Sequence, residues 1–322
     1  MNKTLPYKTK QFFFVLIKLS IVVSAFYFIY KKLTNNDSLQ FSVFADFLSK
    51  KNLFTPKNII LLFFLSFFNW FLEILKWKTL VSFVKKITFK NALEQSLGAL
   101  TASLFTPNRV GEYGAKAMCY PANIRKRIVL INLLSNLLQM TVTVILGLIG
   151  FYFLITTYKV NLDYYKLASV FAISLMVVFL IGFGIKKSKL SIKGFSLEKV
   201  KQFILKFPRD KIVSGFLLSL LRYAIFSFQF YFLLQLFDIN ITYRSAIMII
   251  TSMYLLASII PSIFIFDVVI KGSVALYLFA LIDVNELTIL SIITIMWLFN
   301  FVLPSVFGSF YVLNFNLPKS ED

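Results

Sequence analysis

Residues 106–116 read TPNRVGEYGAK and combine side chains that bind and balance charge inside a membrane. Arg109 is followed by Glu112 and then, four residues later, by Lys116. An acid four residues before a base lies on the same helical face, in the favourable order for an ion pair. We therefore predict a pair between Glu112 and Lys116, with Arg109 beside it to bind an anion such as phosphate. The alternative is an ion pair that only holds helices together.

The same segment predicts a break between two helices. Pro107 ends one helix, and Asn108 is suited to cap the next. Gly111 and Gly114 allow close approach of backbone or ligand, and Tyr113 belongs to the same predicted binding segment. The second half-helix would direct N–H groups and its positive dipole end towards an anion. A tightly packed hairpin whose glycines serve contact alone is the alternative.

A second segment repeats this pattern 154 residues later. The sequence ITFKNAL at 87–93 resembles ITYRSAI at 241–247, and Pro261 breaks the second stretch as its counterpart breaks the first. Beyond it, Asp267 precedes Lys271 by four residues. We predict two proline-broken helical hairpins related by an internal repeat. Chance similarity between apolar helices is the alternative.

The elements that must position these motifs are membrane-spanning helices. The 322 residues are 58% hydrophobic, 18% aromatic and only 15% charged, whereas soluble domains carry about 25% charged residues. Six apolar runs approach the roughly 20 residues that cross a bilayer core, at 11–30, 58–75, 128–156, 164–185, 212–237 and 287–312. The predicted fold is an all-α polytopic membrane protein with six full spans and two hairpins, which we expect to be re-entrant. An eight-span protein is the alternative.

The spans are expected to form one integral membrane domain over residues 1–322. Repeat 1 covers about 57–157 and repeat 2 about 212–313, joined by a linking span at 164–185 and a basic cytoplasmic loop at 186–211. The first apolar run lacks a small-residue cleavage site, which indicates a retained helix rather than a signal peptide.

The distribution of Lys and Arg predicts an orientation in a bacterial-type cytoplasmic membrane. The net charge of +20 on a polytopic chain indicates an excess of bases on the cytoplasmic side, not nucleic-acid binding. With both termini cytoplasmic, the inner segments hold 21 bases and four acids, and the outer segments eight bases and six acids. Five of the inner bases lie at 76–90, beginning with Lys76. The hairpins then enter from opposite sides, so the repeats have inverted topology, as in many transporters.

Other polar residues lie inside the apolar stretches. Charged groups near a helix centre cost roughly 2.5–3.5 kcal/mol each. Glu73 and Arg222 either anchor helix ends or line a cavity. Asn136, Gln139 and Asn300 either line a polar path or make hydrogen bonds between helices.

Several chemistries are excluded by composition. The chain has no His and one Cys, Cys119, which excludes His-based metal sites, His-based catalysis and internal disulfides. It has no Gly-rich nucleotide loop, so no ATP-driven step is encoded. We predict no metal and no cofactor.

The motifs also carry a resemblance, in residues 106–113, the basic cluster 125–127, Gln139, 261–271 and 297–308. Together they resemble the lysylphosphatidylglycerol synthase transmembrane-region family over about residues 10–313. The resemblance implies a flippase-like membrane domain. Fused family members carry a soluble aminoacyl-transferase domain that modifies phosphatidylglycerol, and we expect no such domain here. Asp267 and Lys271 stand where a Glu-x-x-x-Arg pattern is typical, and Lys lacks the bidentate fork of Arg.

Three functions remain open from the sequence. The first is a flippase-like translocator of a lipid or lipid-linked anionic molecule, with membrane lipids as its partners. Its predicted substrate-binding residues are Asn108, Arg109, Gly111, Glu112, Tyr113, Lys116, Asp267 and Lys271. The second is an integral-membrane transferase acting on a lipid or polyprenyl carrier, with Glu112 or Asp267 as base. The third is an accessory subunit of a separate synthase or glycosyltransferase.

Overall fold

The computed structural model describes most of both predicted repeats. The described residues are 16, 18–20, 23, 27, 55–104, 106, 109–158, 197–259 and 267–317, without the side chains of 197–199 and 267–271. The predicted span at 164–185, most of that at 11–30, and the predicted helix breakers Pro107, Asn108 and Pro261 lie outside this part of the chain.

Four predicted spans are confirmed as helices long and apolar enough to cross a membrane. They are α3 (Pro56–Val81), α6 (Arg125–Tyr158), α9 (Arg209–Leu236) and a continuous rod of α12 (Glu286–Trp297), the π-helical turn η2 (Leu298–Val302) and α13 (Leu303–Leu313). Every described element is a helix. The protein is therefore a multi-pass membrane protein built from helices.

The helix starts follow from local sequence. Thr55 caps α3 by accepting a hydrogen bond from the Asn58 N–H, and Pro56 occupies the first turn, where its missing N–H costs nothing. Thr88 caps α4 (Phe89–Ser103) in the same way, through the Asn91 N–H at 3.2 Å.

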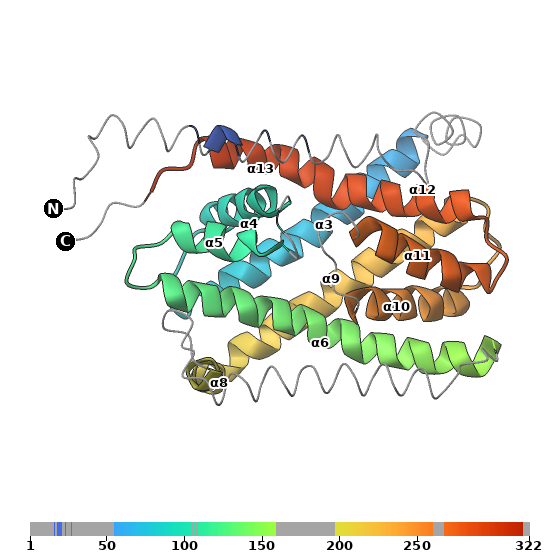
Figure 1. Cartoon of the computed structure of the whole chain (residues 1–322), viewed down its shortest axis with the longest axis horizontal. Coiled ribbons are helices and arrows are strands. Elements are labelled where there is room, and N and C mark those ends of the chain that lie inside the picture. Colours follow the sequence, from blue (N-terminus) through green and yellow to red (C-terminus); the bar gives the residue numbers. More distant parts are fainter. Residues whose placement is uncertain are drawn as a thin grey trace.

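Both proline-broken stretches fold as pairs of shorter helices. The first pair is α4 and α5 (Gly111–Met118), and the second is α10 (Tyr243–Ile259) and α11 (Asp267–Ala280). Figure 1 shows α4 and α5 at one end of the molecule and α10 and α11 at the other, between α6 on one side and the α12–α13 rod on the other.

One predicted loop is partly helical. We predicted a basic loop at 186–211, but α8 (Leu197–Lys206) occupies its second half and α9 begins at Arg209. A bend at Phe207 separates the two helices, because Pro208 cannot continue the preceding helix.

Close crossings hold the short helices against the long ones. Gly308 of α13 packs on Leu97 and Thr101 of α4 so tightly that a Cβ there would collide with the Leu97 carbonyl oxygen. At the other end, Gly147 of α6 packs on Thr251 and Leu255 of α10. Thr251 and Leu255 lie 154 residues after Leu97 and Thr101, which is the spacing of the predicted repeat.

Apolar clusters form on either side of the molecule's centre. Phe230, Ile249 and Phe279 belong to a cluster built largely from α9, α10, α11 and α12. Trp77 and Ile128 belong to a second cluster that includes α3 and α6. The candidate site is formed by buried polar and charged side chains, among them Lys116, which contacts Trp77 of the second cluster.

Candidate functional site

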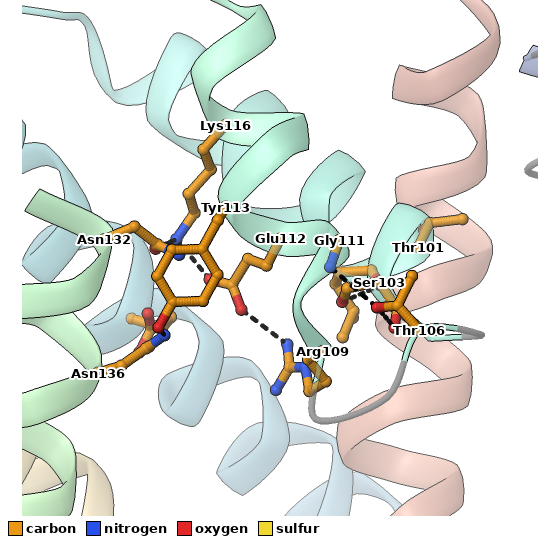
Figure 2. Close-up of polar contacts among 12 residues, drawn as sticks. Thr101, Ser103, Thr106, Arg109, Gly111, Glu112, Tyr113, Lys116, Asn132 and Asn136 are labelled. Carbon is orange, nitrogen blue, oxygen red and sulfur yellow. Dashed lines mark hydrogen bonds and ion pairs between the residues drawn. The ribbon is translucent and has the colours of Figure 1, made fainter. Parts of the chain in front are cut away.

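The predicted ion pair of the first motif is present and buried. Lys116 Nζ lies 2.7 Å from Glu112 Oε1, and the Lys116 side chain is only 1% exposed. The same ammonium donates to Asn132 Oδ1 at 2.9 Å and lies 4.2 Å from the centre of the Trp77 ring. A carboxylate, an amide oxygen and an aromatic face thus compensate a cation that would otherwise be costly to bury. Figure 2 shows Lys116 and Glu112 of α5 beside Asn132 of α6.

Arg109 lies on the other side of the same carboxylate. Its NH2 nitrogen is 3.6 Å from Glu112 Oε2, and its guanidinium lies 5.6 Å from the centre of the Phe301 ring. The side chain is 37% exposed, whereas its Nε is buried and has no hydrogen-bond partner among the described residues. The backbone of Arg109 has a φ of 56°, a left-handed conformation that residues other than glycine rarely adopt. Such strain is found at functional sites more often than elsewhere.

The turn that carries Arg109 is fixed by hydroxyl groups. The Gly111 N–H donates to Thr106 Oγ1 at 2.9 Å, and that hydroxyl donates to the Ser103 carbonyl at 2.7 Å. A Cβ on Gly111 would lie 2.7 Å from the Ala102 carbonyl oxygen, so the predicted close approach is confirmed there. At Gly114, by contrast, no described atom beyond its own helix and chain neighbours lies within 4 Å of the Cβ position, so no close approach of backbone is seen there.

A second charged group, from α3 and α9, faces the first. Glu73 Oε2 lies 2.8 Å from Lys76 Nζ and 2.7 Å from Arg222 NH1. Lys76 was predicted among the cytoplasmic bases, but its side chain is 1% exposed inside the protein. The prediction was wrong because α3 continues to Val81 and turns Lys76 towards Glu73, one helical turn away.

The two charged groups line one small cavity. Its volume is about 40 Å³, and its lining residues are Trp70, Glu73, Ser96, Arg109, Glu112, Lys116, Asn136 and Arg222. A cavity needs roughly 10–15 Å³ to hold one water molecule, so this cavity admits a small polar group. Three cations and two carboxylates in its wall favour an anion over an apolar ligand.

The polar face of α6 contacts both charged groups. Asn136, which lines the cavity, donates to the Tyr113 hydroxyl at 2.9 Å, so the predicted binding residue Tyr113 lies beside the cavity (Figure 2). Gln139 Oε1 lies 3.5 Å from Arg222 NH1. These side chains make interhelical hydrogen bonds, and Asn136 also faces the cavity.

Comparison with known sequences decides the family. The profile of the lysylphosphatidylglycerol synthase TM region matches residues 15–308. The chain belongs to this family. No curated protein and no solved structure matches it. Membership relates the protein to lipid-modifying or flippase-like membrane proteins.

Within this family member, Asn300 joins the charged groups to the last span. Asn69 Nδ2 donates to Asn300 Oδ1 at 2.8 Å, and Asn300 Nδ2 donates to Gln229 Oε1 at 2.9 Å. The Asn300 carbonyl accepts from Trp70 Nε1 at 2.9 Å. It is free to do so because the residue four positions on, Pro304, has no N–H to donate. The π-helical turn at Leu298–Val302 accompanies this gap in the helical bonding.

A continuous polar chain results. Hydrogen bonds run from Ser66 through Gln229, Asn300, Asn69 and Arg222 to Glu73. Our sequence interpretation missed Ser66, Asn69, Ser96 and Gln229. The signal for α3 was nevertheless present, since positions 66, 69, 73 and 76 are three or four residues apart and share one helix face.

The second motif lies only partly within the described region. The backbone of Asp267 and Lys271 belongs to α11, but their side chains are outside the described residues. Glu73 and Arg222 are the described charges that the structure brings opposite the first motif.

Proposed function

We propose that this protein is a flippase-like translocator that moves a lipid or lipid-linked molecule with an anionic head group across the cytoplasmic membrane. The observation that carries the proposal is the cavity between α3, α4, α5, α6 and α9, lined by Arg109, Lys116 and Arg222. Charged side chains inside a membrane protein are costly and mark substrate pathways. The family relationship supports the same class of function.

The depth of the cavity supports a role in transit across the membrane. Glu73 lies eight residues before the end of α3, and Arg222 lies 13 residues after the start of α9. At 1.5 Å per residue these positions are about 12 and 20 Å from the helix ends. Half of a bilayer core is roughly 15 Å. The head group would thus bind near the midplane, where transporters with interrupted helices hold their substrates.

The arrangement of the helices supports an inverted repeat. The contacts of α13 with α4 correspond to those of α6 with α10, and α3 packs directly on α9. The hairpins lie at opposite ends of the molecule (Figure 1). The contacted positions in α4 and α10 are 154 residues apart, which is the offset of the predicted repeat. Inverted repeats allow a central site to face each side of the membrane in turn.

Helix lengths support re-entrant hairpins. α4 has 15 residues and α5 has eight, or about 22 and 12 Å at the helical rise. Each is shorter than the roughly 20 residues of a full span.

The described charges support cytoplasmic termini. The end of α3 and the starts of α6 and α9 lie at one end of the molecule, where Lys211 Nζ donates to Ser82 Oγ at 2.6 Å. That end carries Lys78, Lys85, Lys86, Lys90, Arg125, Lys126, Arg127, Arg209 and Lys211. Short loops rich in Lys and Arg stay on the cytoplasmic side.

Arg109 is the residue that we expect to contact the head group first. It is the most exposed cation of the cavity, and its 3.6 Å contact with Glu112 is the longest of the four ion pairs found among the described residues. A phosphate oxygen would bind the guanidinium more strongly than this loose contact does, because arginine matches phosphate geometry through two parallel hydrogen bonds.

The test is transport by the purified full chain in proteoliposomes. Fluorescent lipids labelled on an anionic head group would be followed by accessibility to an external quencher, and lipids would be analysed by mass spectrometry. Faster exchange between leaflets than in protein-free vesicles, with unchanged lipid masses, is expected. A new lipid product without exchange would instead establish the transferase.

A further inference from the structure

The charges around the cavity do not cancel. Glu73 contacts two cations, Lys76 and Arg222, and Glu112 contacts two others, Arg109 and Lys116. All of these except Lys76 line the cavity directly. Each group of one carboxylate and two cations therefore has a net charge of +1, and the two groups together carry two excess positive charges.

Unsatisfied donors face the same space. The Ser96 hydroxyl lines the cavity from α4, and this residue is 4% exposed. Its Oγ and the Nε of Arg109 are buried and have no partner among the described residues. Buried donors that lack a partner are rare in native proteins, since each costs the free energy of its lost hydration. The excess positive charge and the unpartnered donors together favour binding of an anion in this cavity.

We propose that the cavity selects a head group with two negative charges, such as a phosphomonoester or a diphosphate diester, over a phosphodiester with one. This inference rests on the proposed function and specifies its substrate class. One negative charge would compensate the excess positive charge of the Glu73 group, and the other would compensate that of the Glu112 group. A monoanion would leave one cation uncompensated in a region of low dielectric, where unpaired charge is costly.

The experiment compares two small anions of similar shape and different charge. Methyl phosphate at pH 8 is a dianion, because the second pKa of a phosphomonoester is about 6, and dimethyl phosphate is a monoanion. Both would be titrated into the detergent-solubilised full chain while tryptophan fluorescence is recorded, since Trp70 lines the cavity. Short-chain phosphatidic acid and phosphatidylglycerol repeat the comparison with lipids. Tighter binding of the lipid monoester than of methyl phosphate is expected of a lipid site.

Variants make the charge argument specific. Wild-type protein is expected to bind methyl phosphate about tenfold or more tightly than dimethyl phosphate. Arg109→Gln removes one excess charge and is expected to reduce that ratio towards one, whereas Lys86→Gln, which removes an exposed charge outside the cavity, leaves it unchanged. Ser96→Ala should weaken binding of both anions. Ser135→Ala removes an equally buried, unpartnered hydroxyl that does not line the cavity, and it should weaken neither.

Two results would overturn the inference. Equal affinities in the wild-type protein, together with Arg109-dependent lipid exchange, would remove the charge preference and leave the proposed function standing. Binding of neither anion, together with no exchange of any labelled lipid, would remove both.

Discussion

Arg222 NH1 of α9 lies 2.7 Å from Glu73 Oε2 of α3, and this contact joins the two predicted repeats at their centre. The two residues are 149 positions apart in the chain. Their pairing explains how α3 and α9, each carrying a charge inside an apolar helix, pack against one another. It also places a cation from repeat 2 in the wall of a cavity whose other charges come from repeat 1.

We predict that Lys76→Met strongly destabilises the protein. Lys76 is buried and donates to Glu73 at 2.8 Å. Losing a buried hydrogen bond to a charged group costs about 1.5–3 kcal/mol, although Arg222 still pairs with Glu73. The thermal unfolding midpoint in detergent should therefore fall. The loss caused by Lys76→Met should be smaller in a Glu73→Gln background, where the pair is already broken. An equal loss in both backgrounds would contradict this pairing.

The helix crossing at Gly308 gives a second prediction. Gly308→Ala forces a Cβ into the Leu97 carbonyl and the Thr101 side chain, and overpacking of this kind costs about 1–3 kcal/mol. Gly114→Ala is the matched control, because the space around it is open. We expect Gly308→Ala to lower the unfolding midpoint and Gly114→Ala to leave it unchanged. Equal midpoints for both variants would show that α4 and α13 do not pack this closely.

Topology can be tested by labelling single cysteines in intact cells. Lys85 and Asn240 are exposed and follow the ends of α3 and α9, so we expect an impermeant maleimide to label Asn240→Cys and not Lys85→Cys. The natural thiol contributes little background, because burial raises the pKa of Cys119, in the turn after α5, to about 12. It stays protonated at pH 8, and the thiolate is the reactive form. Labelling of both positions from outside would exclude the predicted orientation.

The sequence predicted much of this architecture because its signals are local. Apolar runs marked the four described spans, and proline marked the breaks between α4 and α5 and between α10 and α11. The Glu112–Lys116 pair followed from a four-residue spacing within one helix. These features depend on neighbours in the chain.

The partners of the site were harder to predict because they come from distant segments. Nothing near Glu73 in the sequence indicates that Arg222 will reach it, or that Asn300 will bind Asn69. Lys76 was misplaced because a lysine near a helix end usually extends to the membrane surface, whereas this one turns inward to a carboxylate. The polar face of α3 was visible in the spacing of its residues, but its pairing required the fold.

Arg109 offers the most direct test, because replacing it with glycine removes the guanidinium and also relieves backbone strain. A loss of function can then be measured without a loss of stability. Its φ of 56° is strained for arginine by about 1–2 kcal/mol, and glycine relieves that strain. Arg109→Gly should therefore fold at least as well as Arg109→Ala, and Lys116 still compensates Glu112 in both variants.

The decisive measurement is the rate of leaflet exchange of an anionic head-group-labelled lipid in proteoliposomes containing equal amounts of folded wild-type protein, Arg109→Gly and Lys86→Gln. We expect Arg109→Gly to keep its unfolding midpoint and lose exchange, while Lys86→Gln retains both. Wild-type exchange rates in the stable Arg109→Gly variant would contradict the assignment of this cavity as the head-group site.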